Sequence, residues 1–115
     1  MRLAFALCLL PLAGCVQQPS TGGEPAPSSY VCAGGKYFAV NYGQDGQTPS
    51  VLLTFANGET ARLLAEPSAS GARYGWPSDG TSYVFWSKGQ EAMVLLKDGT
   101  RGGKETVVYT DCKLQ

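Results

Sequence analysis

The chain has 115 residues, including 15 glycines, 7 prolines and 4 cysteines, and its nine lysines and arginines balance nine aspartates and glutamates. A chain of this length holds one small domain, and a net charge of zero without a basic stripe argues against nucleic-acid binding. The sequence has no histidine, which excludes a Ser-His-Asp triad, a Cys-His pair and most zinc sites, so we expect no metal and no cofactor.

Residues 1–14 are predicted to form a secretory signal peptide. The segment carries Arg2, then an unbroken apolar run from Leu3 to Leu10, then proline and small residues. A membrane-spanning helix needs about 20 apolar residues, and this run is much shorter. The segment therefore predicts export.

The end of this segment, "LAGC" at residues 12–15, resembles a bacterial lipobox. The resemblance implies that Cys15 is acylated and becomes the first mature residue; an ordinary signal peptide ending near a cysteine is the alternative. Acyl chains contribute about 0.8 kcal/mol per buried methylene and can hold a domain at a membrane. Val16 after the cysteine suggests the outer membrane. Residues 15–28, rich in proline, glycine and serine, are predicted to be a tether.

Cysteine counting predicts one disulfide in the remaining domain, residues 29–115. Cys8 leaves with the signal and Cys15 is lipidated, so Cys32 and Cys112 remain. An exported protein meets an oxidising compartment, which favours their pairing. A redox or metal-binding thiol pair is the alternative, although no histidine and no third nearby cysteine completes such a site.

The domain is predicted to be all-β. Short runs rich in β-branched and aromatic residues are separated by turns that contain glycine, and no long window keeps a helical period. The runs are residues 36–42, 50–56, 59–65, 81–86, 91–96 and 105–112. Asn57-Gly58 is a two-residue hairpin signal between the second and third runs. So small an antiparallel sheet protects its edges best by closing into a barrel, with Phe38, Phe55 and Phe85 in its core.

The segment "SASGARYGWPSDG", residues 68–80, follows the third run and is predicted to be a loop, because it has no apolar periodicity. Ser70 in this loop and Lys88 in the turn "SKGQ" raise one enzymatic possibility, with lysine as the base for a serine nucleophile. Such a lysine must be desolvated, whereas a polar turn keeps it charged. The glycine-rich residues 98–104 lack the P-loop spacing and are predicted to be a turn. We expect no enzyme.

Two motifs in this part of the chain carry a resemblance to a known family. "SGARY" (residues 70–74) and "YVFWSKGQEAMVLL" (residues 83–96), framed by "YVCAGG" and "YTDC", resemble the membrane-bound lysozyme inhibitors of c-type lysozyme. The resemblance covers Tyr30 to Cys112. This chain departs from the pattern at "GWPS", residues 75–78, which lengthens the loop after Tyr74.

The resemblance implies an antiparallel barrel of about eight strands that inhibits a c-type lysozyme, with Ser70 and Lys88 reaching the two catalytic carboxyl groups of the enzyme. It also implies a lipid anchor at the outer membrane, and we expect the domain on the periplasmic face. The residues expected to bind lysozyme are Ser70, Gly71, Ala72, Arg73, Tyr74, Trp76, Lys88 and Gly89. A structural or peptidoglycan-binding lipoprotein, with exposed tryptophan and tyrosine stacked on sugars, is the alternative.

Overall fold

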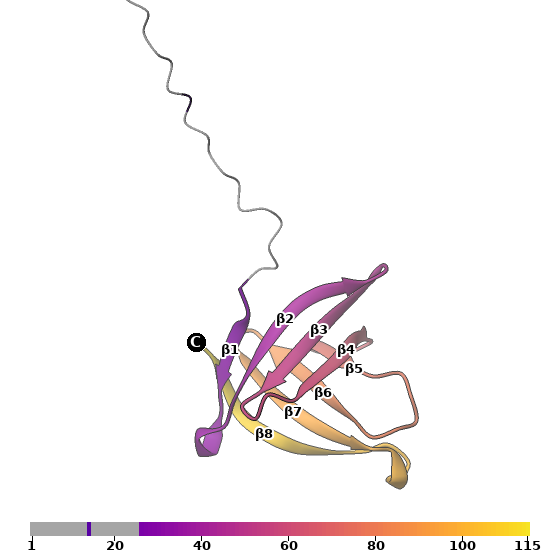
Figure 1. Ribbon diagram of the computed structural model, residues 1–115. Helices are drawn as coiled ribbons and strands as arrows, with labels where there is room; N and C mark the ends of the chain where they lie inside the picture. The colour runs from indigo at the N-terminus through magenta and orange to yellow at the C-terminus, as the bar shows by residue number, and fades with distance from the viewer. Residues whose placement is uncertain (1–13, 15–25) are drawn as a thin grey trace, which may run out of the picture.

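The strands pair in sequence order and close into a single antiparallel barrel in the computed structural model, which describes Gly14 and residues 26–115 (Figure 1). The all-β prediction and the small barrel are therefore confirmed. The elements are β1 (Ser28–Val31), η1 (Ala33–Gly35), β2 (Tyr37–Asp45), β3 (Thr48–Phe55), β4 (Thr60–Glu66), β5 (Ala72–Gly75), β6 (Ser82–Lys88), β7 (Glu91–Asp98), η2 (Gly99–Arg101) and β8 (Lys104–Leu114).

The core consists of the side chains that alternate strand positions send into the barrel. Phe38, Phe55 and Phe85 are all buried, as predicted. Phe38 stacks on Tyr30 at 5.2 Å between ring centroids and meets Phe85 edge to face at 5.9 Å. Burial of each large apolar side chain stabilises the fold by about 1.5–3 kcal/mol, so this aromatic cluster is a main source of stability.

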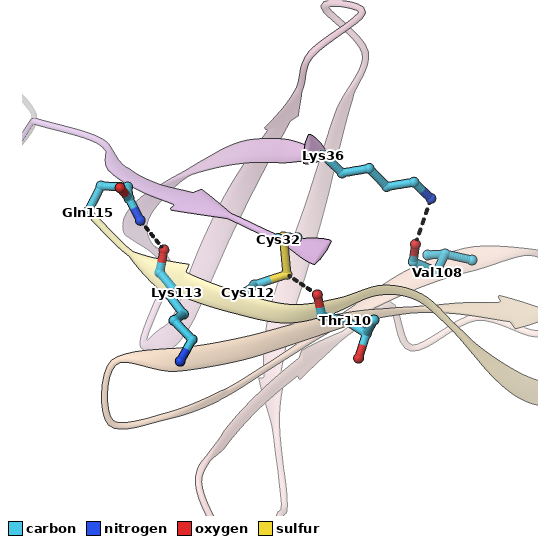
Figure 2. The surroundings of a disulfide bond; sticks show 7 residues. All are labelled: Cys32, Lys36, Val108, Thr110, Cys112, Lys113 and Gln115. Carbon is cyan, nitrogen blue, oxygen red and sulfur yellow. Dashed lines mark hydrogen bonds between the residues drawn. A yellow bond between two sulfur atoms is a disulfide. The ribbon is translucent and has the colours of Figure 1, made fainter. Parts of the chain in front are cut away.

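A disulfide joins Cys32 to Cys112 beside the seam where β1 meets β8 (Figure 2). The seam is short, because the register pairs only Tyr30 with Leu114 and Val31 with Lys113. Both cysteines are buried, and the predicted pairing is confirmed. The bond covalently reinforces the weakest closure of the barrel.

Two strands were missed by the sequence analysis, β1 and β5. Strand β5 lies inside the segment predicted to be a loop. Its residues 72–75 pair with β4 on one side and with β6 on the other. Four residues are too few to show a period, and β5 exists because neighbours on both sides satisfy its backbone groups. The loop prediction for residues 68–80 was therefore wrong over this stretch.

Two turns differ from their sequence predictions, the one at Lys88 and the hairpin at Asn57-Gly58. Lys88 was placed in a turn, but it is the last residue of β6 and pairs with Glu91. The Asn57-Gly58 hairpin has three loop residues rather than two, since the Phe55 amide donates to the Glu59 carbonyl at 2.8 Å. Gly58 closes that loop with a left-handed φ of 88°.

The predicted turn at residues 98–104 is confirmed as the connection between β7 and β8. Three predictions lie outside the described residues: the signal peptide apart from Gly14, the lipidation of Cys15, and the tether as far as residue 25. β1 begins at Ser28, the last residue of the predicted tether. In the part of the chain that the structure describes, no helix has the length and apolar character needed to cross a membrane.

Candidate binding site around Ser70 and Lys88

The connection between β4 and β5, residues 67–71, is fully exposed and lies directly against the end of β6; we call it the Ser70 loop. Gly71 has a left-handed φ of 68°. A Cβ atom added there would lie 2.4 Å from the Ser87 carbonyl oxygen and 2.7 Å from Cγ of Lys88. Only glycine allows this approach. The structure thus brings the Ser70 loop next to Lys88, the two parts of the chain that the family resemblance singled out.

Lys88 ends β6 with an exposed side chain, one position beyond the β5–β6 pair of Ala72 and Ser87. Its ammonium nitrogen lies 4.8 Å from the ring centre of Trp86. Such a cation–π contact requires the positive charge and favours one position of a flexible side chain. Gly89, also exposed, follows with a left-handed φ of 60° and turns the chain into β7.

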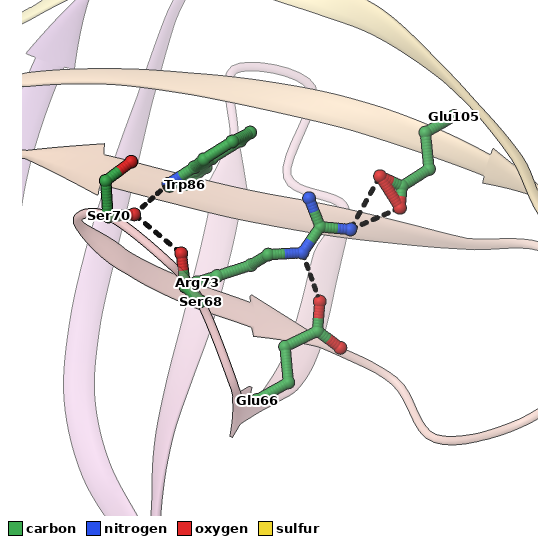
Figure 3. Close-up of polar contacts among 6 residues, drawn as sticks. All are labelled: Glu66, Ser68, Ser70, Arg73, Trp86 and Glu105. Atoms are coloured by element: carbon green, nitrogen blue, oxygen red, sulfur yellow. Dashed lines mark hydrogen bonds and ion pairs between the residues drawn. The ribbon is translucent and has the colours of Figure 1, made fainter.

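Trp86 connects these two parts of the site and was not among the predicted site residues. Its indole nitrogen donates to the backbone carbonyl of Ser70 at 2.8 Å, and the hydroxyl of Ser68 donates to the same carbonyl at 2.6 Å (Figure 3). A signal was present in the sequence: Trp86 stands two residues before Lys88, so strand alternation puts both on one face. A half-buried indole also needs a hydrogen-bond acceptor.

Arg73 lies behind Trp86, with its guanidinium 5.4 Å from the indole ring centre. It forms ion pairs with Glu66 and Glu105, the latter through Nη2, which donates to Oε1 at 2.6 Å (Figure 3). Burial alone lowers the pKa of Arg73, but the hydrogen bonds and charges of Glu105 and Glu66 outweigh it and raise the pKa. The charge of this predicted contact residue is thus neutralised within the protein.

Glu66 and Glu105 are the other residues that the sequence analysis missed. Glu66 faces Arg73 in the β4–β5 register, whereas Glu105 belongs to β8, three strands away from β5. No sequence spacing indicates the second contact, because it depends on how strongly the sheet curves.

Tyr74 faces the barrel interior, opposite to Arg73. It packs against the core, with its ring centroid 6.1 Å from that of Phe85 and 6.3 Å from that of Tyr42. Trp76 is 38% exposed but lies at the other end of β5 from the Ser70 loop. It lines a surface hollow of about 350 Å³ together with Arg62 and Leu96. The structure therefore does not bring these two predicted residues to Ser70 and Lys88.

The surface around Lys88 suits a protein partner better than a small ligand. The hollow beside Lys88, lined also by Trp86, Met93 and Asp111, has a volume of about 110 Å³. Pockets for small molecules usually measure about 300–1,000 Å³. Among residues 26–115 and Gly14, no three histidine, cysteine or acidic side chains are grouped to hold a metal. The Ser70 loop and Lys88 are both exposed and therefore accessible to a partner.

Comparison with known proteins agrees with the motifs in the sequence. Residues 30–101 match the family described as "Membrane-bound lysozyme-inhibitor of c-type lysozyme", and this range includes the Ser70 loop and Lys88. A protein of Escherichia coli (strain K12) named "Membrane-bound lysozyme inhibitor of C-type lysozyme" is 50% identical over 48 residues. That segment covers 42% of this chain and 34% of the relative, so the match spans about a third of the relative's length. No solved structure matches the chain.

Proposed function

Because this chain belongs to the family of membrane-bound lysozyme inhibitors of c-type lysozyme, we propose that it inhibits a c-type lysozyme by inserting the Ser70 loop and Lys88 into the active-site cleft. The observation that carries this proposal is the contact of Gly71 with β6, which presents Ser70 and Lys88 together at one exposed edge of the barrel. Ala72 and Gly89 flank them and complete the proposed contact surface.

The chemistry of the two side chains matches what such an enzyme needs. A c-type lysozyme cleaves a glycosidic bond with one protonated and one ionised carboxyl group. The ammonium of Lys88 beside both groups favours their charged forms and lowers the pKa of the general acid. The hydroxyl of Ser70 donates a hydrogen bond to a carboxylate oxygen of the enzyme. This bond replaces the one from water that the oxygen loses when the inhibitor covers it.

The remaining predicted contact residues take supporting roles in this proposal. Arg73 stabilises β5, the strand that follows the Ser70 loop, through its ion pairs with Glu66 and Glu105. Tyr74 anchors the same strand to the core. Trp76 makes no part of the primary contact, because it lies at the far end of β5.

A lipid anchor on Cys15 at the outer membrane completes the proposal. The lipobox-like residues 12–15 support it, and the family is described as membrane-bound. On the periplasmic face, such an anchor holds the barrel next to the peptidoglycan that lysozyme attacks.

The test is a turbidity assay with residues 28–115, which contain all eight strands and the disulfide. This domain, titrated against a c-type lysozyme that is clearing bacterial cell walls, is expected to stop lysis at a near-stoichiometric ratio. Undiminished lysis in the presence of oxidised, folded domain would contradict the proposal.

Two other functions give different results in simple assays. A peptidoglycan-binding lipoprotein, favoured by the exposed Trp76 beside Arg62, binds cell walls when no lysozyme is present. A Ser70/Lys88 hydrolase turns over a substrate and loses all activity in Lys88→Arg, because arginine cannot act as the base. The exposed position of Lys88 over the Trp86 ring favours a binding role.

A further inference from the structure

Trp86 contacts Ser70, Lys88 and Arg73, three residues of the predicted site. Its ring faces the ammonium of Lys88, and its N–H group donates a hydrogen bond to the carbonyl of Ser70. The guanidinium of Arg73, paired with Glu66, also lies against the ring. A single side chain thus contacts the loop, the lysine and the partly buried ion-pair cluster.

We propose that Trp86 is the positioning residue of the binding site: it holds the Ser70 loop by its indole N–H and Lys88 by its ring, so that both reach the partner at a set separation. This inference rests on the proposed function, which it deepens by naming the residue that orders the site before binding. Ordering before binding matters because immobilising a free loop and a lysine side chain on association reduces affinity.

The location of Trp86 argues against a role in the core alone. Strand alternation puts it on the outer face, opposite to Phe85, and it is only half-buried. Within the described part of the chain, its indole makes the one side-chain hydrogen bond that reaches the Ser70 loop from outside the loop. The ring therefore supports a segment that is otherwise fully exposed.

Arg73 supports Trp86 from the neighbouring strand, β5. Its guanidinium is fixed by carboxylates from two different strands, so it provides a rigid surface for the indole. Arg73 and Trp86 also face each other in the β5–β6 register. The ion pairs thus hold Arg73, and Arg73 supports Trp86. Trp86 in turn contacts Ser70 and Lys88.

Three variants separate the two contacts of Trp86. Trp86→Phe keeps an aromatic ring for Lys88 but removes the N–H donor, and Trp86→Leu removes both. Trp76→Phe is the matched control, because it changes the other tryptophan at the far end of β5. Each is compared with the wild type by thermal unfolding, so that a loss of fold is recognised.

The first readout needs no lysozyme. The backbone amide order parameters of residues 68–71 are expected to be lower in Trp86→Phe and Trp86→Leu, because the loop loses the hydrogen bond to the Ser70 carbonyl. The ring-current shift of the Lys88 Hε protons is expected to persist in Trp86→Phe and to disappear in Trp86→Leu. Trp76→Phe is expected to match the wild type in both measurements.

The second readout is the affinity for a c-type lysozyme. Loss of one hydrogen bond in Trp86→Phe is expected to raise Kd about two- to tenfold, and Trp86→Leu is expected to raise it further. A folded Trp86→Phe with wild-type loop order parameters and wild-type affinity would overturn the positioning role. A wild-type domain that binds no c-type lysozyme would instead overturn the proposed function, while the loop order parameters still decide what Trp86 does.

Discussion

Arg73 on β5 and Glu105 on β8 form an ion pair that crosses the two intervening strands, β6 and β7, on the outer face of the barrel. Val84 and Leu95 lie on these strands and face away from the core, yet they are only 1% and 7% exposed. Their burial, on the two strands that the ion pair spans, shows that this part of the outer face is covered. The outer face behind the binding site is thus a second, smaller packed region.

Removal of Arg73 is expected to destabilise the fold, because it leaves Glu66 and Glu105 close together without a counter-charge. The side chains in this cluster are only 18–32% exposed. Breaking a fully buried pair costs about 3–5 kcal/mol, and for this partly exposed cluster we expect Arg73→Met to lose about 2 kcal/mol in urea unfolding. Arg62→Met is the matched control: Arg62 pairs with Asp45 at 3.7 Å, with both side chains more than half exposed, and should lose less than about 1 kcal/mol. Equal losses would contradict the role of the cluster.

Gly71→Ala is expected to reduce both stability and inhibition. Alanine in the left-handed region costs about 1–2 kcal/mol, and here its Cβ would also collide with the Ser87 carbonyl and push the loop away from Lys88. Gly46→Ala is the matched control, with a φ of 61° and no atom within 4 Å of the added Cβ. Denaturant unfolding and lysozyme titration of the two variants separate backbone strain from the close approach. Full inhibition by a folded Gly71→Ala would show that this approach is not needed.

The Ser70→Ala/Lys88→Ala double variant is expected to lose most of the inhibition while its melting temperature stays within a few degrees of the wild type. Both residues are exposed and lie outside the core, so their truncation leaves the fold intact. Lys88→Arg keeps the charge and should lose only part of the inhibition. Complete inhibition by the double variant would refute the site assignment.

The domain is expected to lose stability at alkaline pH because of two tyrosines. Desolvation, followed by the neighbouring Tyr30 and Tyr74, raises the pKa of Tyr42, and desolvation with Tyr83 and Glu59 raises that of Tyr109. Above pH 10.0, the ordinary value, the unfolded chain releases protons that the folded chain retains, so the free energy of unfolding falls.

Tyr42→Phe tests this pH dependence. The variant should show a flatter decline than the wild type between pH 10 and 12 in urea unfolding. Because 43% of Tyr42 is exposed, we expect a modest difference in slope. Identical slopes in the two proteins would count against the raised pKa of Tyr42.

Loss of the disulfide is expected to destabilise the barrel strongly. The bond closes a loop with a sequence separation of 80, for which the chain-entropy relation gives about 4.5 kcal/mol. Unfolding of Cys32→Ser/Cys112→Ser should therefore begin at a much lower urea concentration, and the seam between β1 and β8 should show the fastest amide exchange. An unchanged unfolding midpoint would mean that strand pairing alone closes the barrel.

The sequence alone determined the all-β class and the pairing of Cys32 with Cys112, and its resemblance to the inhibitor family pointed to Ser70 and Lys88. Period-two alternation, turn residues and cysteine counting are local signals, and they need no knowledge of which strands are neighbours. The two motifs carried the family resemblance for the same reason, since each is a continuous stretch of the chain.

Only the tertiary structure decided how the site is supported. β5 exists because β4 and β6 flank it, and Tyr74 faces inward because of its register. Glu105 reaches Arg73 across two strands, and Trp86 reaches the Ser70 carbonyl. These contacts depend on the closure and curvature of the barrel, which set distances between residues that no sequence spacing encodes.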